Sequence, residues 1–306
     1  MCTAVTFKSA NQHVYFARTM DLPTTTAWRP VYFPAGFMWQ PSTTAVGQKL
    51  PFSIIGGGRW TPGNHYLLGD GMNTAGLSCA ELYFPIEAHY AAEELVDKTN
   101  LTPQDFIYWA LQFQTVAEVA NALPTINIVA KRWYSESNWR PFHWILADKT
   151  GITAILEPQN ETLTLQPISI PVLTNTPNYL AHLKRLADLV KATQLNTATL
   201  ASYTGALPSG NLPTSRFQRA AVHLAQLSTS ASPKDQLLAL LDDVAIPRTA
   251  QRLQRHNLDY THYEIVMDLT TQTLTFKSMR TLEQHQLKLS DLVKNNSAHV
   301  VAYPFT

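Results

Sequence analysis

The order of strand-like and helix-like segments along the chain predicts an α+β fold. Strand-like runs occupy the first third, a helical stretch follows, and strands, helices and strands then succeed one another. A doubly wound α/β fold would instead show regular alternation of single strands and single helices. We therefore expect mainly antiparallel sheets built from hairpins, with helices packed against them.

The first hairpin is predicted at the very start of the chain. Residues 2–8 and 13–18 are rich in β-branched and aromatic residues, and Ser9-Ala10-Asn11-Gln12 separates them. Such a pattern is typical of two strands joined by a short turn. Folding about the centre of the turn places Cys2 opposite Thr19, to within one or two residues.

Cys2 combines a nucleophile and a base if Met1 is removed, as is common before a small second residue. An α-amine has a reference pKa of about 8 and a thiol one of about 8.5, so a neutral amine can accept the thiol proton. The hairpin also returns Arg18 and Asp21 to the chain start, where a guanidinium favours a thiolate and a carboxylate can orient the amine. The alternative is that Cys2 is an ordinary small residue opening a strand. We favour the catalytic interpretation because position, hairpin length and both charged residues coincide.

Further strands are expected before a first helical layer. The strand-like runs are 31–33, 52–55, 65–68 and 76–84, with a turn at 69–73 and a flexible bend at Gly56-Gly57-Gly58. Thr102 is expected to cap a helix with Pro103 at its first position, and helical character resumes over 117–123.

The second half of the chain repeats both patterns. Strands are expected at 142–147, 152–156 and 162–165, which short turns join into an antiparallel meander. Apolar residues at helical spacing predict helices over 179–192, 216–227 and 233–244. A last hairpin is expected from 263–269 and 273–276.

Met1-Cys2-Thr3, the run Phe-Ala-Arg-Thr-Met-Asp at 16–21 and several later motifs resemble the choloylglycine hydrolase family. These N-terminal nucleophile hydrolases include the bile salt hydrolases and the penicillin V acylases, and the similarity covers nearly the whole chain. The resemblance implies an αββα sandwich, two mainly antiparallel sheets between helical layers. The sequence shows no repeat and no linker long enough to separate two domains, so we expect a single domain over residues 2–306. It also implies hydrolysis of an amide through an acylated Cys2, a reaction that requires no metal or organic cofactor.

Two later motifs match further active-site positions of the family. Asn175, in Leu-Thr-Asn-Thr-Pro at 173–177, matches the Asn whose amide helps to hold the oxyanion, although Asn before Thr-Pro is also ordinary turn chemistry. Arg216, in Ser-Arg-Phe at 215–217, matches the late catalytic-site Arg of the family. An Arg in the first turn of a helix opposes the helix dipole, so we expect a compensating partner.

Tyr83 bears on the substrate. It lies in Ala-Glu-Leu-Tyr-Phe-Pro at 80–85, at the position where bile salt hydrolases typically carry Asn and penicillin V acylases Tyr. Its backbone N–H would be the other oxyanion donor and its ring could pack against an aryl acyl group, unless it simply packs within its strand. The resemblance thus predicts a penicillin V acylase-like amidohydrolase. The alternatives are a bile salt hydrolase, an acyl-homoserine lactone acylase, or an inactive binding protein of the same fold.

Composition limits the partners. The 23 basic and 22 acidic residues, with 15% charged, argue against nucleic acid or a membrane surface and leave a small N-acyl amide as the expected partner. The family resemblance adds a homo-oligomer, a tetramer or a dimer. No apolar run approaches the roughly 20 residues of a membrane span, and we expect a cytoplasmic protein.

Other chemistries are disfavoured by what the motifs lack. The ten His include no pair at helical metal spacing, and Cys79, expected to be buried, has no Cys-x-x-Cys companion. The glycine run at 56–58 lacks the Gly-Lys-Ser/Thr ending of a P-loop. Residues 76–80 lack the second Gly of a nucleophile elbow, so a serine esterase is a poor alternative.

Overall fold

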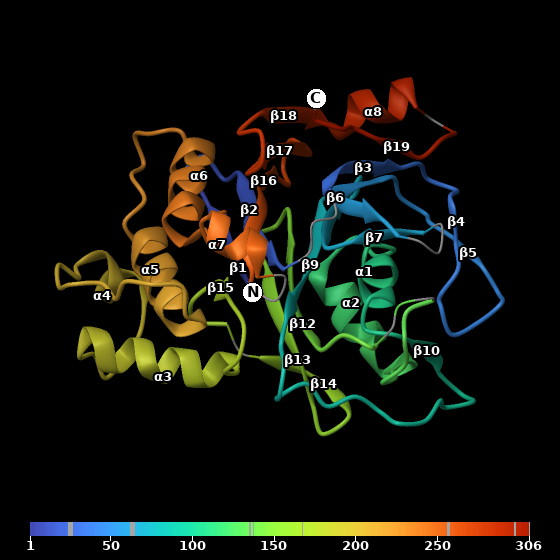
Figure 1. Cartoon of the computed structure of the whole chain (residues 1–306), viewed down its shortest axis with the longest axis horizontal. Helices are drawn as coiled ribbons and strands as arrows, with labels where there is room; N and C mark the ends of the chain where they lie inside the picture. The colour runs from blue at the N-terminus through green and yellow to red at the C-terminus, as the bar shows by residue number, and fades with distance from the viewer. Residues whose placement is uncertain are drawn as a thin grey trace.

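The computed structural model describes residues 1–23, 27–61, 65–134, 136, 138–166, 168–255, 258–296 and 298–305. Two large antiparallel sheets carry the fold, and helices cover the outer side of each (Figure 1). The predicted α+β class with two mainly antiparallel sheets between helical layers is confirmed. In the part of the chain so described, no helix is both long enough and apolar enough to cross a membrane.

The first sheet contains the chain start, in the strand next to its edge. Its order is β15 (Val172–Leu173), β1 (Cys2–Lys8), β2 (Val14–Leu22), β16 (Tyr260–Asp268), β17 (Thr273–Ser278) and β18 (Gln284–Lys288). The helices on its side of the molecule are α3 (Tyr179–Val190), α4 (Thr197–Ala201), α5 (Pro213–Ala225), α6 (Pro233–Val244) and α7 (Ala250–Gln254). Of these, α5 contacts β1 and β15, while α6 contacts β2 and β16.

The second sheet lies against the first. Its order is β14 (Thr162–Gln166), β13 (Thr153–Gln159), β12 (Phe142–Asp148), β9 (Leu77–Tyr83), β8 (Asp70–Asn73), β6 (Ile54–Trp60), β3 (Arg29–Phe33) and β19 (Val301–Ala302), with β7 (Tyr66–Leu68) also paired to β6. Its outer face is covered by α1 (Asp105–Ala110) and α2 (Val116–Ala122).

Smaller elements complete the chain. They are the pair β4 (Met38–Trp39) and β5 (Gln48–Lys49), the parallel pair β10 (Thr99–Leu101) and β11 (Ile126–Ile128), the 3-10 turn η1 (Leu123–Thr125), and α8 (Leu289–Asn295).

Neighbouring residues in the strands of the second sheet face different cores. Ile145 and Ala147 of β12 belong to the core that the two sheets share, whereas Leu146 between them belongs to the core under α1 and α2. Ile55 and Ile54 of β6 divide in the same way. Successive side chains of a strand point to opposite faces, so a strand buried on both faces is largely apolar.

The first hairpin differs from the prediction by one residue. Lys8 pairs with Val14, so five residues connect the strands, and Gln12 adopts a φ of 68° between them. Cys2 therefore lies opposite Met20, not Thr19, a shift within the stated margin. The longer connection moves the centre of the turn, and the pairing moves with it.

The expected bend at residues 56–58 and the expected turn at 69–73 were wrong. Residues 56–58 are buried within β6, and residues 70–73 form β8. A Cβ on Gly57 would lie 2.2 Å from the Tyr263 hydroxyl, and one on Gly56 would lie 2.0 Å from the Asp70 backbone oxygen. Glycine is needed in β6 because Tyr263 of the first sheet and the Asp70 backbone approach its chain so closely.

Helix boundaries moved in two places. The N-cap of α1 is Gln104, not Thr102, because Thr102 instead donates its hydroxyl to the Asp105 carboxylate (2.8 Å). The helix predicted from Arg216 begins at Pro213, which leaves Arg216 in the first turn of α5. Cys79 is fully buried in β9, as expected.

Candidate active site

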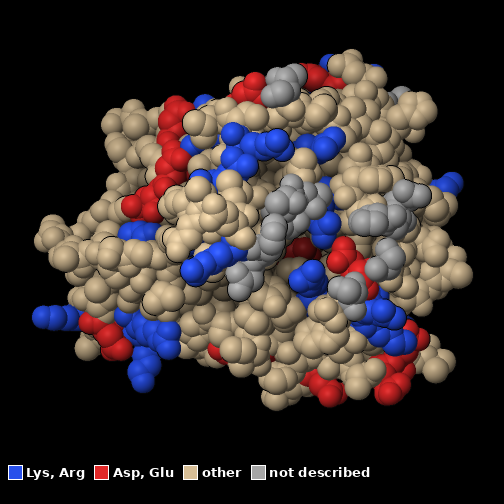
Figure 2. Space-filling model, viewed as in Figure 1, with Lys and Arg blue, Asp and Glu red and all other residues tan. Residues whose placement is uncertain are grey.

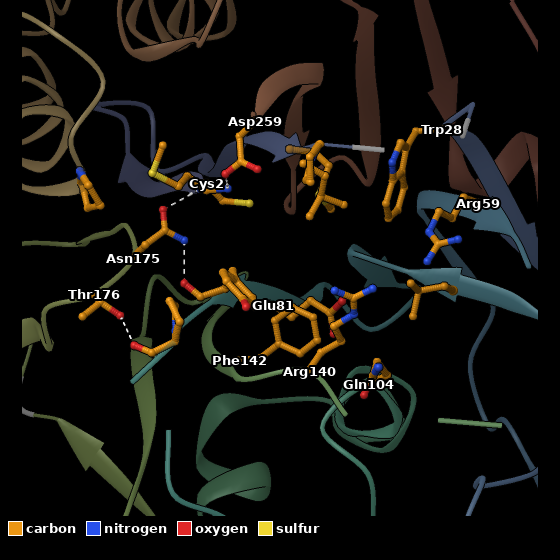
Figure 3. A pocket seen from close by; sticks show the side chains of 18 of the residues that line it. Cys2, Trp28, Arg59, Glu81, Gln104, Arg140, Phe142, Asn175, Thr176 and Asp259 are labelled. Atoms are coloured by element: carbon orange, nitrogen blue, oxygen red, sulfur yellow. Dashed lines mark hydrogen bonds and ion pairs between the residues drawn. The ribbon is translucent and has the colours of Figure 1, made fainter. Parts of the chain in front are cut away.

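The Cys2 thiol lies at the chain start, where β1 meets β15 and β2. Cys2 is only 3% exposed, and its Sγ is 3.9 Å from the Asp21 backbone oxygen. Its backbone nitrogen donates to Asn175 Oδ1 at 2.7 Å (Figure 3). Met1 still precedes it, and the Met1 amine donates to the Asp21 backbone oxygen (2.7 Å) and pairs with the Asp259 carboxylate (2.5 Å).

Arg216 connects the Cys2 peptide to Asn175. Its Nη1 donates to Cys2 O and to Thr3 Oγ1, both at 2.7 Å, and its Nη2 donates to Asn175 Oδ1 at 2.8 Å. Asp21 Oδ2 lies 3.8 Å from Nη1 and supplies the opposite charge that an Arg at a helix N-terminus needs. Burial lowers the pKa of Arg216, and Asp21 opposes that change. A guanidinium nevertheless stays charged in proteins.

The Asp21 carboxylate is fully buried beneath the chain start. It accepts hydrogen bonds from the hydroxyls of Thr261 (2.7 Å) and Thr19 (3.3 Å). Burial raises its pKa, while Arg216, the chain amine, Thr261 and Arg18 act in the opposite direction. In this chain with Met1 present, the Cys2 nitrogen contacts Asn175, and Asp21 contacts the cluster through Arg216.

Arg18 faces the second sheet. Its Nη1 donates to Gly69 O at 2.6 Å and lies 3.3 Å from Asp70 Oδ2. Burial acts to lower the pKa of Arg18, but the charges of Cys2, Tyr263, Asp70 and Asp21 together raise it above the ordinary value. Arg18 is therefore held by the second sheet and interacts electrostatically with Cys2.

Tyr83 and Asn175 face each other across the site. Phe84 N donates to Pro141 O (2.8 Å), so Phe84 and Pro141 form a hydrogen-bonded pair at the end of β9 and β12. Because the two kinds of pair alternate along an antiparallel ladder, the next pair, Tyr83 and Phe142, is a non-hydrogen-bonded pair. The backbone N–H and C=O of Tyr83 therefore point away from β12, and its C=O accepts from Asn175 Nδ2 at 2.6 Å. An Asn amide has two N–H groups, so one remains for another acceptor.

Two buried histidines fix the backbone around Asn175. His182 Nε2 lies 2.7 Å from Asn175 O, and His143 Nε2 lies 2.8 Å from Thr174 O. Burial lowers the pKa of His182 to about 4, so this ring is neutral near pH 7. With its proton on Nε2, it donates to the Asn175 carbonyl.

A cavity of about 520 Å³ lies next to Cys2. Figure 3 shows Cys2, Asn175 and Asp259 at one end, Trp28, Arg59 and Gln104 toward the other, and Glu81 between them. Figure 2 shows a hollow in the face viewed there, with basic and acidic side chains around it. Tyr83 and Phe142 contribute aromatic walls, their ring centroids 6.3 Å apart.

The comparison with family models decides the identity. The model described as "Linear amide C-N hydrolases, choloylglycine hydrolase family" matches residues 2–303. The chain belongs to the choloylglycine hydrolase family. It is therefore a hydrolase of linear amide C–N bonds, and the predicted family and enzyme class are confirmed.

Similar proteins include a curated relative in sequence and two solved structures that share the fold. The chain is 28% identical to a bile salt hydrolase/transferase of Clostridium perfringens, over 97% of this chain and 94% of the relative. The crystal structure of an R18L variant of a conjugated bile acid hydrolase from Clostridium perfringens superposes with a TM-score of 0.85 at 24% identity, covering 100% and 97% of the two chains. A penicillin V acylase from Agrobacterium tumefaciens superposes with a TM-score of 0.76 at 22% identity, covering 98% and 90%.

This choloylglycine hydrolase family member gathers all six residues singled out in its sequence around one site. Cys2, Tyr83 and Asn175 line the cavity. Arg18, Asp21 and Arg216 are fully buried behind it. Among the described residues, no group of His, Cys, Asp and Glu side chains could hold a metal ion.

Sequence reasoning missed Asp259 and several polar side chains that line the cavity. Asp259 precedes a strand that was predicted to begin only at residue 263, and nothing in its local sequence marks a site. Glu81 did carry a signal, because it is the only charged residue in the apolar run 77–84. A lone carboxylate in a buried strand needs a physical reason.

Proposed function

We propose that this enzyme hydrolyses an N-acyl amide through a thioester on Cys2, after Met1 has been removed. One observation carries the proposal: the nitrogen and carbonyl of Cys2, Arg216 and Asn175 form one hydrogen-bonded cluster at the end of the cavity. A binding protein would gain nothing from a buried thiol placed among two guanidinium groups and a carboxylate. The inactive alternative is disfavoured for that reason.

The proposed cycle uses the α-amine of Cys2 as the base. The neutral amine takes the thiol proton, and the thiolate attacks the amide carbonyl near the positive charges of Arg18 and Arg216. Collapse of the tetrahedral intermediate breaks the C–N bond, and the protonated amine returns the proton to the leaving nitrogen. Water then cleaves the thioester. Asp21 orients the amine in this scheme, and no cofactor takes part.

The oxyanion would be held by the second N–H of Asn175 Nδ2 and by the backbone N–H of Tyr83. Support comes from the direction of the Tyr83 backbone, which faces Asn175 and not β12. Loss of one such donor typically costs about 3 kcal/mol of transition-state stabilisation. Arg216 and His182 would keep Asn175 in place through its Oδ1 and its backbone oxygen.

For the acyl group, the proposal is a penicillin V acylase-like preference. Tyr83 and Phe142 form an aromatic wall that suits a phenoxyacetyl group. Bile salt hydrolysis is the second candidate, favoured by the relatives of that name, and acyl-homoserine lactones are a third class to assay. The single domain over 2–306, the homo-oligomer and the cytoplasmic location stay predictions of the sequence.

Mass spectrometry tests the mechanism directly. The intact mass of the purified protein should correspond to a chain that begins at Cys2. Reaction with penicillin V or glycocholate, quenched in acid, should add the acyl mass to the peptide that contains Cys2. The same adduct should form in Cys79→Ala, which removes the other thiol, and should be absent from Cys2→Ala. Full turnover by a chain that keeps Met1 would overturn the proposal.

A further inference from the structure

A second cavity, of about 470 Å³, adjoins the cavity beside Cys2 and shares Trp28 with it. Three arginines line it: Arg29 at the start of β3, Arg248 between α6 and α7, and Arg280 just after β17. Figure 2 shows basic side chains gathered above the hollow, in the region where Figure 1 places β17 and β3. We call this second cavity the basic groove. Its three cations come from separate segments of the chain.

No acidic side chain balances these cations. Among the residues that the structure describes, neither Asp nor Glu lines the basic groove. The sequence positions outside the described ranges also contain neither Asp nor Glu. The whole chain has 23 basic and 22 acidic residues, so a generally basic composition does not explain this local excess of positive charge.

The guanidinium groups of the basic groove differ from most others in the protein. Within the described ranges, none of the three makes a hydrogen bond or an ion pair. Elsewhere, carboxylate oxygens lie at distances of up to 3.9 Å from the guanidinium groups of Arg18, Arg59, Arg140, Arg216 and Arg219. Like charges around one cavity repel one another, and a bound anion removes that repulsion.

The fold holds the three arginines in place before any ligand binds. The guanidinium carbon of Arg248 lies 6.0 Å from the centroid of the Tyr260 ring, a cation–π contact. The backbone nitrogen of Arg280 donates to Ser278 Oγ at 3.3 Å, and Arg29 pairs with β6 in the second sheet. Because the backbone positions are already set, binding an anion requires less ordering of the protein.

His262 lines the basic groove as a neutral ring. Burial lowers its pKa to about 4, and the charge of Arg248 acts in the same direction. Its Nε2 lies 3.0 Å from Leu22 O, so with its proton on Nε2 the ring donates to that carbonyl. The positive charge of the groove near pH 7 therefore comes from the three guanidinium groups.

Guanidinium groups select the chemistry of the anion. The planar fork of an arginine matches the oxygens of a phosphate group and binds them through two parallel hydrogen bonds. One phosphate group carries at most about two negative charges near pH 7, fewer than the positive charges of the groove. Two linked phosphate groups carry more charge and offer oxygens to several guanidinium groups at once, and a cavity of about 470 Å³ has room for them.

We propose that the basic groove binds a small molecule that carries a diphosphate group, with Arg29, Arg248 and Arg280 as donors to its oxygens. The diphosphate comes either from free pyrophosphate or from a nucleoside diphosphate, for which Tyr260 and Phe305 supply aromatic surface in the groove lining. This inference does not depend on the reaction at Cys2, because binding in the groove is measured without turnover.

Isothermal titration calorimetry on the whole protein, in metal-free buffer with about 0.15 M salt, tests the ligand class. We expect saturable binding of pyrophosphate, at least about 10-fold tighter than binding of inorganic phosphate or of citrate. Titration with ADP distinguishes the two sources: tighter binding of ADP than of pyrophosphate indicates a nucleotide, and the reverse indicates free pyrophosphate. Absence of saturable binding for both compounds would overturn the proposal, as would citrate binding as tightly as pyrophosphate.

Substitutions locate the binding. Arg248→Gln and Arg280→Gln should each weaken pyrophosphate binding by about 10-fold, the effect of one charge-assisted hydrogen bond. Arg132→Gln, which removes an exposed guanidinium outside the groove lining, should keep the wild-type affinity. Equal weakening by all three substitutions would show a general effect of charge and would overturn the site.

Thermal denaturation gives an independent measurement. Pyrophosphate should raise the Tm of the wild-type protein and of Arg132→Gln, because a ligand that binds only the folded state stabilises it. The double variant with Arg248→Gln and Arg280→Gln should show no such rise. Both replaced side chains are exposed, so we expect this variant to fold, and its Tm without ligand checks this. An equal rise in the double variant would place the anion elsewhere and overturn the proposal.

Discussion

Replacing Arg216 with Met should damage both the stability and the activity of the enzyme, in a manner that depends on pH. Met keeps much of the side-chain volume and removes the charge. The change leaves Cys2 O and Asn175 Oδ1 without the guanidinium donors that lie 2.7 and 2.8 Å away. It also leaves the fully buried Asp21 without the cation at 3.8 Å.

The size of the effect follows from the burial of both partners. Breaking a buried ion pair by removing one partner typically costs about 3 to 5 kcal/mol of unfolding free energy, because the other charge stays buried. We expect a loss of that size near pH 7. Activity should fall at least as much as for loss of one oxyanion donor, about 100-fold, because Arg216 also holds Asn175.

The pH dependence follows from Asp21. Burial raises its pKa in the folded protein, so the native state binds this proton more tightly than the unfolded state does. Stability from this group is therefore present below the unfolded pKa and is lost as pH rises through the folded one. Arg216 is the strongest influence that lowers the pKa of Asp21, so its removal raises that pKa further and extends the loss to higher pH. The stability difference between the two proteins should be smaller near pH 5 than near pH 7.

Chemical denaturation at several pH values measures this difference, and Arg219→Met is the matched control. Arg219 lies on the same helix, but it pairs with Asp243, whose side chain is 38% exposed, and its Nη1 donates to the Pro208 and Gly210 carbonyls. The control should lose about 1 to 2 kcal/mol, without the same pH dependence, and should keep its activity. An equal loss for Arg216→Met at both pH values, or unchanged kcat/KM, would refute the reasoning.

Three further substitutions address the nucleophile, its carboxylate and the acyl pocket. Cys2→Ser should keep the fold, checked by circular dichroism, and lose nearly all hydrolysis, because the same amine deprotonates a hydroxyl far less readily; comparable turnover would count against the mechanism. Asp21→Asn should lower kcat/KM strongly. It should also remove the fall in rate that occurs as pH drops through the raised pKa of Asp21. An unchanged pH–rate profile would exclude a role for Asp21 in orienting the amine. Tyr83→Asn should reduce a preference for penicillin V over glycocholate by about 1 to 3 kcal/mol in relative kcat/KM. A wild-type enzyme that clearly prefers glycocholate would reject the penicillin V acylase-like assignment.

Local sequence predicted the parts of the fold that local forces determine. The hairpin of β1 and β2 and the helices α3, α5 and α6 follow from period-two and helical patterns within single segments. The strand conformation of residues 56–58 could not be predicted from such local patterns. Glycine there reflects the approach of Tyr263, which is more than 200 residues away in sequence and lies on the other sheet.

Local sequence likewise predicts only some of the residues of the candidate site. Cys2, Arg18 and Asp21 could be brought together from sequence because one hairpin carries all three. Asn175 and Arg216 needed the family resemblance, since nothing local relates them to the chain start. The polar lining of the cavity could not be predicted, because its side chains come from separate segments that only the folded chain brings together.

The guanidinium groups of the two active-site arginines bind residues on different sheets, and this explains why the site needs both sheets. Arg216 comes from α5 and binds the Cys2 peptide and Asn175, so it fixes the nucleophile relative to the first sheet. Arg18 lies on β2, but its guanidinium is held by Gly69 and Asp70 of the second sheet. Asp70 is in turn held by the Gly57 N–H at 2.8 Å and by the Tyr263 hydroxyl, which crosses back from the first sheet. A positive charge beside Cys2 therefore depends on the correct packing of one sheet on the other, so any change that separates β6 from β16 should lower activity before it unfolds the protein.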